Sequence, residues 1–566
     1  MKIKTLISVN ALAAMLVACG GGDIELNPSN TVIDSNNTTN NTTNNNGGGG
    51  NSGDDNPCAT YTENGQTRQG NFSDGNCTYG ASFVSDTNPL TVDLDIPALE
   101  NGGIHIFENS LWVGEDVDSA DAASGVQIPQ EGEGPVLNIE AGSLIAFSTS
   151  NDYVRIARGS AINAEGTAEA PIIFSAVADL RDGAGTESDR GLWGGVQING
   201  NGITNKCTDE QRQATGNNVH SCHITAEGRP ATYGGNNNAE SSGILRYVVI
   251  KHAGFEVVDG SELNGLTLNA VGSGTTIEYV QTYTTQDDGF EMFGGAVDLK
   301  NIVAVNVGDD SIDYSEGWVG NIQFALVTHT SGSNRCVEAD NTGEGRADDL
   351  APFTKGRISN MTCITSNVDE GQGDDPSSKG DSEGPLFREG AFFEMYNSIV
   401  TANTADMSSN ECFELDDSEG PETIAAAVGG WSVAKSNVIA CTEATKAGVD
   451  PANGAFDINA WLASGENTNN VILDENTTGA LPAVVIEGLD SNPRAYITAA
   501  SMTDGNGGAI NVPVYDVTML ENTFDAAAAP ALGDSGTSNF FEAVDFIGAV
   551  SADNDWVAGW TVGLDN

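Results

Sequence analysis

Short apolar runs that recur at nearly constant spacing in the middle of the chain restrict its fold more than any other feature. Four runs begin at Leu245, Ile277, Leu299 and Ile322, so successive runs are 32, 22 and 23 residues apart. A unit of 22 to 23 residues with short strands, sharp turns and no helical stretch is typical of one coil of a parallel β-helix. Longer spacings then indicate coils with loop insertions. The sequence predicts an all-β solenoid whose inward side chains stack into one core.

The series continues more loosely through runs that begin at Ile358, Met395 and Lys435. An asparagine recurs at one position of these runs: Asn301, Asn360, Asn397 and Asn437. Two other repeat architectures fit less well. A leucine-rich repeat has a similar length, but its LxxLxLxxN pattern is missing, and a propeller would need a longer and regular period.

Several segments resemble a widespread family of bacterial surface proteins. They are GLWGGVQINGN (residues 191–201), DDGFEMFGG (287–295) and the terminal FFEAVDFIGAVSADNDWVAGWT (540–561). Members of that family are often lipoproteins or secreted, and their body is a right-handed parallel β-helix of the pectin-lyase-like type. The resemblance therefore implies a right-handed parallel β-helix on the cell surface. No biochemical activity is established for the family, so the resemblance implies no catalytic residues.

The N-terminus has the pattern of an export signal. Residues 1–18 combine Lys2 and Lys4 with an apolar stretch that is too short to span a bilayer. They end before Cys19 in a motif that resembles the bacterial lipobox, in which the cysteine becomes lipidated. Gly20, instead of an aspartate, favours the outer membrane, with the lipid as the contact to the membrane. An ordinary signal peptide with an incidental Cys19 is the alternative.

The chain after Cys19 divides into four regions. Residues 19–57 are rich in Asn, Thr and Gly and predict a disordered tether that carries the lipidated cysteine. Residues 58–90 are interpreted as an N-terminal cap, 91–445 as the β-helix with loop insertions, and 446–566 as a C-terminal cap region.

The eight remaining cysteines predict disulfides, because their count is even in an exported chain. They fall as local pairs: Cys58 and Cys77, Cys207 and Cys222, Cys336 and Cys363, Cys412 and Cys441. Nearest-neighbour pairing is the simplest choice, although the sequence does not determine connectivity, and free or metal-binding cysteines are an alternative. The absence of any CxxC disfavours zinc. The last two pairs are interpreted as crosslinks between coils.

The charge balance limits the partners. The chain has 80 Asp plus Glu against 22 Lys plus Arg, a net charge of −58. Such a surface repels nucleic acid and attracts divalent cations. We therefore expect no nucleic-acid partner.

Acidic residues also recur at the coil spacing. The pairs Asp288/Glu291, Asp310/Asp313, Arg335/Glu338 and Glu411/Glu414 align, with inserted coils before the last. Two carboxylates about 5 Å apart repel by about 3 kcal/mol at an effective dielectric constant near 20. Ca²⁺, which prefers oxygen ligands, would relieve this repulsion. The predicted metal ligands are Asp287, Asp288, Asp309, Asp310 and Asp313. A solvated acidic face is the alternative.

Two kinds of glycan-cleaving enzyme share the predicted fold and remain as alternatives. Asp288, Asp309 and Asp310, with His329 and Arg357 downstream, are similar in outline to the polygalacturonase site, but that family's Asn-Thr-Asp and Gly-His-Gly motifs are absent. A Ca²⁺-dependent lyase would need a basic residue, for which the candidates are Lys300, Arg335 and Arg388.

Four tryptophans next to glycine-rich corners could pack in the core or stack on sugar rings: Trp112, Trp193, Trp318 and Trp431. The favoured function is a binding or structural module for a glycan, a cell-surface partner or a divalent cation, without catalysis.

Overall fold

The computed structural model describes residues 56–213, 220–229, 231–258, 261–329, 332–342, 350–366, 382–402, 411–416, 422–441, 443–450, 454–474, 485–486, 502–503, 511–520, 540–551 and 553–564. The predicted signal peptide, Cys19 and nearly all of the predicted tether lie outside the described residues. None of the described helices is both long and apolar enough to cross a membrane.

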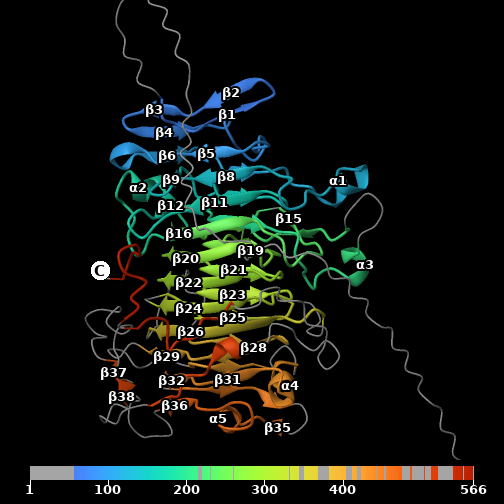
Figure 1. The fold of residues 1–566 in the computed structure, drawn as a ribbon, viewed down its shortest axis with the longest axis vertical. Helices are drawn as coiled ribbons and strands as arrows, with labels where there is room; N and C mark the ends of the chain where they lie inside the picture. Colours follow the sequence, from blue (N-terminus) through green and yellow to red (C-terminus); the bar gives the residue numbers. More distant parts are fainter. Residues whose placement is uncertain are drawn as a thin grey trace, which may run out of the picture. The chain divides into compact units, whose positions relative to one another are not determined.

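Two parallel sheets form the body, and their strands stack coil upon coil (Figure 1). In spatial order, the ten-stranded sheet consists of β33 (Lys446–Ala447), β30 (Glu414–Leu415), β27 (Leu386–Phe387), β25 (Glu338–Ala339), β23 (Ile312–Ser315), β21 (Phe290–Phe293), β19 (Leu266–Asn269), β13 (Val196–Asn199), β10 (Val154–Ile156) and β7 (Leu111–Val113). Every pairing in this sheet is parallel.

The second sheet has eighteen strands, and all its pairings are parallel except β3 with β4. In chain order they are β3 (Asn71–Ser73), β4 (Asn76–Tyr79), β5 (Leu94–Ile96), β6 (Ile104–Phe107), β8 (Val136–Ile139), β9 (Leu144–Phe147), β11 (Ala161–Glu165), β12 (Ile172–Ala176), β16 (Gly243–Lys251), β20 (Thr276–Tyr283), β22 (Asp298–Val305), β24 (Asn321–Thr328), β26 (Lys355–Thr365), β28 (Phe392–Tyr396), β29 (Ile399–Ala402), β31 (Val433–Lys435), β32 (Val438–Cys441) and β36 (Val471–Asp474).

Short helices and antiparallel strand pairs lie outside the two large sheets. The helices are α1 (Ser119–Ser124), α2 (Val177–Leu180), α3 (Asp209–Arg212), α4 (Glu422–Gly429) and α5 (Ile458–Leu462). The antiparallel pairs are β1 (Thr60–Glu63) with β2 (Gln66–Gln69), β14 (Ile224–Thr225) with β15 (Thr232–Tyr233), β17 (Glu256–Val258) with β18 (Ser261–Glu262), β34 (Val449–Asp450) with β35 (Gly454–Ala455), and β37 (Val485–Ile486) with β38 (Met502–Thr503).

The register of the eighteen-stranded sheet confirms the predicted repeat. Leu245 pairs with Ile277, Ile277 with Leu299, and Leu299 with Ile322. Parallel pairing continues from β4 to β36, so the stack of coils extends beyond the predicted limits of 91 and 445 at both ends.

The long strands of this sheet bend at one recurring position, where the backbone has positive φ. Its occupants are Tyr247, Tyr279, Asn301, Phe324, Asn360, Asn397 and Ser436, with φ between 49° and 62°. Asparagine adopts this left-handed conformation more readily than most residues, which explains its recurrence. The prediction was wrong by one residue in the last coil, because Met395 pairs with Ala434 and Ser436, not Asn437, occupies the bend.

Buried apolar side chains fill the space between the sheets as vertical stacks. The rings of Phe107 and Phe147 are 5.8 Å apart, and those of Phe147 and Trp193 are 4.7 Å apart and nearly parallel. Trp193 and Trp318 are fully buried, so both belong to the core. Full burial of one such side chain stabilises the fold by about 1.5 to 3 kcal/mol.

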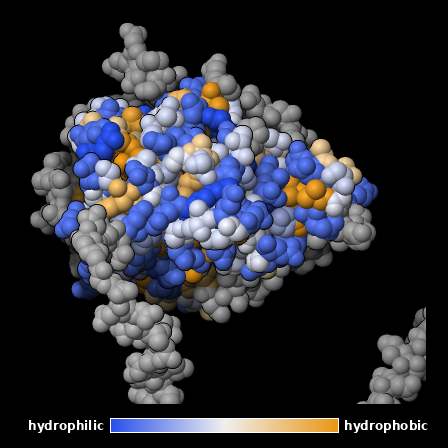
Figure 2. Space-filling view, turned by 90° about the horizontal axis from the view of Figure 1, so that it is seen from above, coloured by the Kyte–Doolittle hydropathy of each residue, from blue (hydrophilic) through white to orange (hydrophobic). Residues whose placement is uncertain are grey.

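The N-terminal end of the stack is closed by β1 to β4. Tyr79 and Phe83 lie over the core, with ring centroids 4.7 Å apart, and Tyr79 stacks on Phe107. Seen from this end, hydrophilic residues are spread among apolar ones over the surface (Figure 2). These strands therefore keep the first apolar layer away from water.

All four predicted cysteine pairs form disulfides, with Cα atoms 5.4, 5.7, 6.1 and 5.8 Å apart in chain order. The last two do not join successive coils as expected. Cys336 and Cys412 each precede a strand of the ten-stranded sheet, whereas Cys363 and Cys441 lie in the strand of the other sheet that follows. Each bond therefore ties the beginning of a coil to the end of the same coil.

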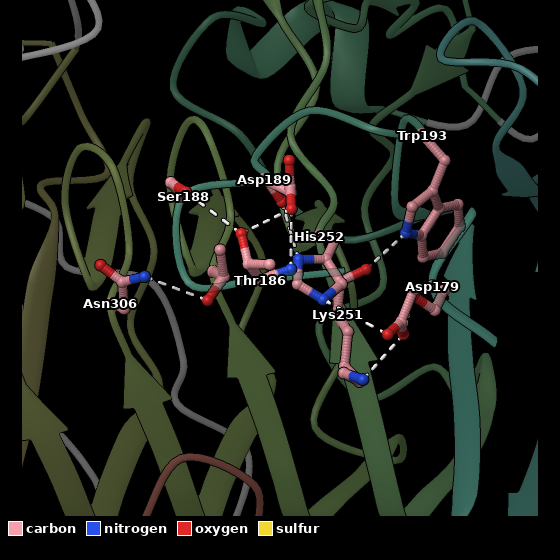
Figure 3. Close-up of polar contacts among 10 residues, drawn as sticks. Asp179, Thr186, Ser188, Asp189, Trp193, Lys251, His252 and Asn306 are labelled. Atoms are coloured by element: carbon pink, nitrogen blue, oxygen red, sulfur yellow. Dashed lines mark hydrogen bonds and ion pairs between the residues drawn. The ribbon is translucent and has the colours of Figure 1, made fainter. Parts of the chain in front are cut away.

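The loop that precedes Trp193 is tied to two later coils (Figure 3). Asp179 pairs with Lys251 at 2.7 Å, and Nδ1 of His252 donates to the carbonyl of Asp189 at 2.7 Å. Two coils further, Asn306 donates to the carbonyl of Glu187 at 2.6 Å. Burial lowers the pKa of His252 and favours its neutral form.

The predicted C-terminal cap region, 446–566, has two different roles. Its first part completes the last coil through β33 and β36. Residues 540–564, drawn in red in Figure 1, instead lie along the outer face of the eighteen-stranded sheet. Four side-chain amides of the sheet, here called the amide clasps, each make two hydrogen bonds to the backbone of residues 515–562: Gln281, Gln323, Asn360 and Asn397.

The aromatic contacts of this segment predict its contribution to stability. Trp560 is 3% exposed, and its ring lies 5.6 Å from that of Tyr247. Because Trp560→Ala leaves a cavity and exposes the sheet, we expect the free energy of unfolding to fall by about 3 to 5 kcal/mol in urea titrations followed by circular dichroism. The control Met519→Ala, at a side chain 74% exposed, should change it by less than about 0.5 kcal/mol. Equal effects of the two variants would contradict this packing.

Candidate metal centre

Two columns of mostly acidic side chains run across the ten-stranded sheet. The turn column lies just before the strands, and its members are Asp288, Asp310, Arg335, Glu383 and Glu411. The strand column consists of Glu291, Asp313 and Glu338. The predicted stacking is confirmed, because Glu291 is the register partner of Asp313 and Asp313 of Glu338. Leu386 stands between Glu338 and Glu414, so one inserted coil separates them, as expected.

The backbone places these carboxylates on the outer side of the sheet. Phe290 and Met292, which flank Glu291, are fully buried in the core. Since successive side chains of a strand point to opposite faces, Glu291 points away from that core. It is nevertheless only 6% exposed. Neighbouring groups therefore shield Glu291 from most of the solvent, whereas Asp313 and Glu338 are partly exposed.

The first two members of the turn column each accept a hydrogen bond from the backbone of the next coil. Asp288 Oδ1 accepts from the backbone of Asp310 at 2.9 Å, and Asp310 Oδ1 accepts from the backbone of Arg335 at 2.8 Å. Among the described residues, no donor contacts the second oxygen of either side chain. Asp313 Oδ1 is buried and has no hydrogen-bond partner in the described part of the chain. Three carboxylates thus retain oxygens for a ligand.

These oxygens gather into three overlapping groups, each with its members within 4.8 Å of one another. The groups are Asp287 with Asp288 and Asp309, Asp288 with Glu291 and Asp313, and Asp310 with Asp313 and Glu338. The structure therefore brings together all five residues predicted as metal ligands. It adds Glu291 and Glu338, which the coil spacing placed in the ladder but which were not predicted as ligands.

Burial and mutual repulsion raise the pKa values in both columns. Burial is the larger cause for Asp288, Glu291, Asp310 and Asp313, whose pKa values lie well above their usual range, and neighbouring carboxylates add to it. Burial is also the main reason why the pKa of Glu338 rises to about 7. These groups resist ionisation unless a cation is close.

Basic side chains neutralise only the later coils. Arg335 lies 3.0 Å from Glu414, and Lys446 lies 2.9 Å from the same carboxylate. Arg388 pairs with Asp340 at 2.8 Å and also contacts Glu338. Within the described residues, no lysine or arginine forms an ion pair with the four earlier carboxylates: Asp288, Glu291, Asp310 and Asp313. Arg388 and Arg335 act on Asp313 and Asp310 only through space, without a direct ion pair.

The residues proposed for glycan hydrolysis are only partly brought together. Asp288, Asp309 and Asp310 are neighbours. His329 is 4% exposed, its nitrogens contact the hydroxyls of Ser311 and Ser382, and burial lowers its pKa to about 3.

Arg357 belongs to β26 of the other sheet and pairs with Glu394 at 3.2 Å. The three basic residues considered for a lyase are also engaged in ion pairs: Lys300 with Glu542, Arg335 with Glu414, and Arg388 with Asp340.

The coil-by-coil register of two parallel sheets defines the class: the protein is a parallel β-helix with an acidic outer face on one sheet. The chain belongs to the family of pectate-lyase-like β-helix domains, whose model matches residues 126–561. No curated protein and no solved structure matches this chain.

The raised pKa of Glu338 predicts how stability depends on pH in a chelator. Its pKa is about 4.5 when unfolded and about 7 when folded, so its stabilising effect is complete below pH 4.5 and is lost as the pH rises through 7. We expect the free energy of unfolding to fall by about 3 kcal/mol over this window from this group alone. Glu338→Gln should flatten the profile, whereas exposed Glu131→Gln should not. A profile that rises with pH would contradict the assignment.

Proposed function

We propose that the protein is a lipid-anchored protein of the outer membrane whose β-helix is a binding or structural module, with Ca²⁺ held on the acidic columns. One observation carries the metal proposal. Asp288, Glu291, Asp310 and Asp313 stack in adjacent coils, and no basic side chain of the described residues pairs with them. A divalent cation supplies the missing positive charge without requiring a side chain.

The donor set suits calcium better than a transition metal. All donors of the three groups are carboxylate oxygens, which are hard ligands, and histidine and cysteine are absent from these groups of described residues. Ca²⁺ accepts six to eight oxygens in flexible geometry, so backbone carbonyls and water can complete its shell. Mg²⁺ demands near-octahedral geometry and retains its water.

The anchoring proposal rests on the N-terminal sequence. The apolar stretch of residues 6–18, the motif that ends at Cys19 and the Asn-rich segment after it support export, lipidation and display on a tether. The four disulfides are compatible with an oxidising compartment.

Glycan cleavage is the second candidate, favoured by the raised pKa values of Asp288 and Asp310. A carboxylic acid that remains protonated near neutral pH can serve as a general acid. His329 and Arg357 give this candidate little support, because both are buried in other contacts.

Calcium titration tests the metal proposal. We expect 1 mM Ca²⁺ to raise the melting temperature of the chelated protein, because saturation at about a hundred times the dissociation constant stabilises by about 2.7 kcal/mol. The double variant D288N/D313N should lose this response. In chelator at pH 8 it should melt above the wild type, since it removes buried like charges. Glu131→Gln is the matched control. A melting temperature that calcium leaves unchanged would contradict the metal proposal.

A polysaccharide panel tests the enzymatic candidate. If the columns are a metal site, no polysaccharide of the panel should be cleaved, as measured by reducing ends or by absorbance of unsaturated products. Turnover that falls at least a hundredfold in Asp310→Asn would instead establish catalysis.

A further inference from the structure

A second feature lies on the same outer face of the ten-stranded sheet, at its N-terminal end. Trp112 of β7 and Arg155 of β10 are register partners. Leu111, Val113 and their equivalents in β10 are fully buried in the core, so Trp112 and Arg155 point outward. The register carries this position through Gln197, Thr267 and Glu291 into the strand column. The two places share one face but no lining residue.

A cavity of about 360 Å³ opens at this position. Its lining combines one aromatic ring, three aliphatic side chains, four carboxylates and one guanidinium: Trp112, Pro89, Val117, Val126, Asp86, Glu115, Asp116, Asp121 and Arg155. The volume lies in the range of about 300 to 1,000 Å³ that small-molecule sites occupy. Five of its nine lining residues are charged, so the lining is more polar than that of most small-molecule sites.

Arg155 is the most unusual member of the lining. It is 2% exposed, yet no carboxylate of the described residues forms an ion pair with it. Its Nη2 donates to the carbonyl of Gly114 at 3.1 Å, and its guanidinium lies 3.7 Å from the centre of the Trp112 ring. Arg155 Nε and Trp112 Nε1 are buried and have no hydrogen-bond partner in the described residues. Unsatisfied buried donors are costly, so they call for an acceptor.

The carboxylates of the cavity divide into engaged and available groups. Asp116 accepts from the backbone and hydroxyl of Thr232 at 2.9 and 3.2 Å, and Asp121 belongs to the capping box of α1. Asp86 and Glu115 are exposed and accept no hydrogen bond from the described residues. The cavity therefore offers two carboxylates, Asp86 and Glu115, as hydrogen-bond acceptors. Its unused donors are Arg155 Nε and Trp112 Nε1, and its aliphatic side chains form an apolar wall.

We propose that this cavity binds a neutral sugar residue. Sugar hydroxyls donate to Asp86 and Glu115 and accept from Arg155, and the C–H face of the ring packs against Trp112, Val117 and Val126. An acidic sugar does not fit, because four carboxylates outnumber the single guanidinium. The inference deepens the proposed binding module, on which it rests, by naming a ligand class and a place for it. It does not depend on calcium.

Ligand-observed NMR and tryptophan fluorescence with the full chain test the proposal. The probes are cellobiose, maltose, lactose and chitobiose, with digalacturonate and glucosamine as charged comparisons, each measured with calcium and with a chelator. We expect one or more neutral probes to bind with similar affinity in both conditions and at low and high salt, since no ion pair contributes. Binding should weaken at least tenfold in Trp112→Ala and in D86N/E115Q.

The D86N/E115Q variant keeps the test valid if Trp112→Ala fails to fold, because both of its side chains are exposed. Glu131→Gln is the control and should bind as the wild type does. The proposal is overturned if no neutral probe binds, if only glucosamine or digalacturonate binds, or if D86N/E115Q binds as tightly as the wild type. If the wild type binds a neutral probe but shows no response to calcium, the metal proposal fails and the sugar proposal stands.

Discussion

The parallel register between successive coils is the constraint on which the rest of this structure depends. Strands of neighbouring coils lie about 4.8 Å apart, so a residue type that repeats with the coil must meet its own copies. For Leu245, Ile277 and Leu299 this contact is favourable and forms the core. For Glu291, Asp313 and Glu338 the same geometry forces like charges together. One rule of construction thus yields both the main stabilising contact and the main electrostatic cost.

The electrostatic cost is handled differently along the stack. In later coils Arg335, Arg388 and Lys446 stand next to the carboxylates, so the chain supplies its own counter-charge. In earlier coils the equivalent positions are acidic, and burial raises their pKa values. A structural ion network and a site open to a cation therefore follow one another in a single column. This division is the physical basis for placing calcium at one part of the column.

Much of the coil could be predicted from the sequence because register repeats locally. The spacing of apolar runs predicted which residues pair, and the spacing of the acids predicted their stacking. The position of the strand bend was harder to predict. Tyr247 and Phe324 adopt there the positive φ that asparagine favours, so the recurrence of asparagine is incomplete. The last two disulfides were paired correctly but were expected to join different coils. Sequence separation alone does not distinguish the end of one coil from the beginning of the next. The placement of residues 540–564 depends on contacts between distant segments, and the cavity at Trp112 depends on loops outside the repeating strands, which no periodicity encodes.

The amide clasps have a consequence for the order in which the chain folds. A solenoid can grow one coil at a time, because each coil needs only its neighbour. In this protein Gln281 forms hydrogen bonds with Val562, which lies 281 residues later in the chain. The ring of Tyr247 likewise packs against that of Trp560. Until residues 540–564 dock, apolar side chains on the outer face of the eighteen-stranded sheet are uncovered, a state prone to aggregation. Docking of this segment is therefore a late step of folding that covers a surface formed by the earlier coils.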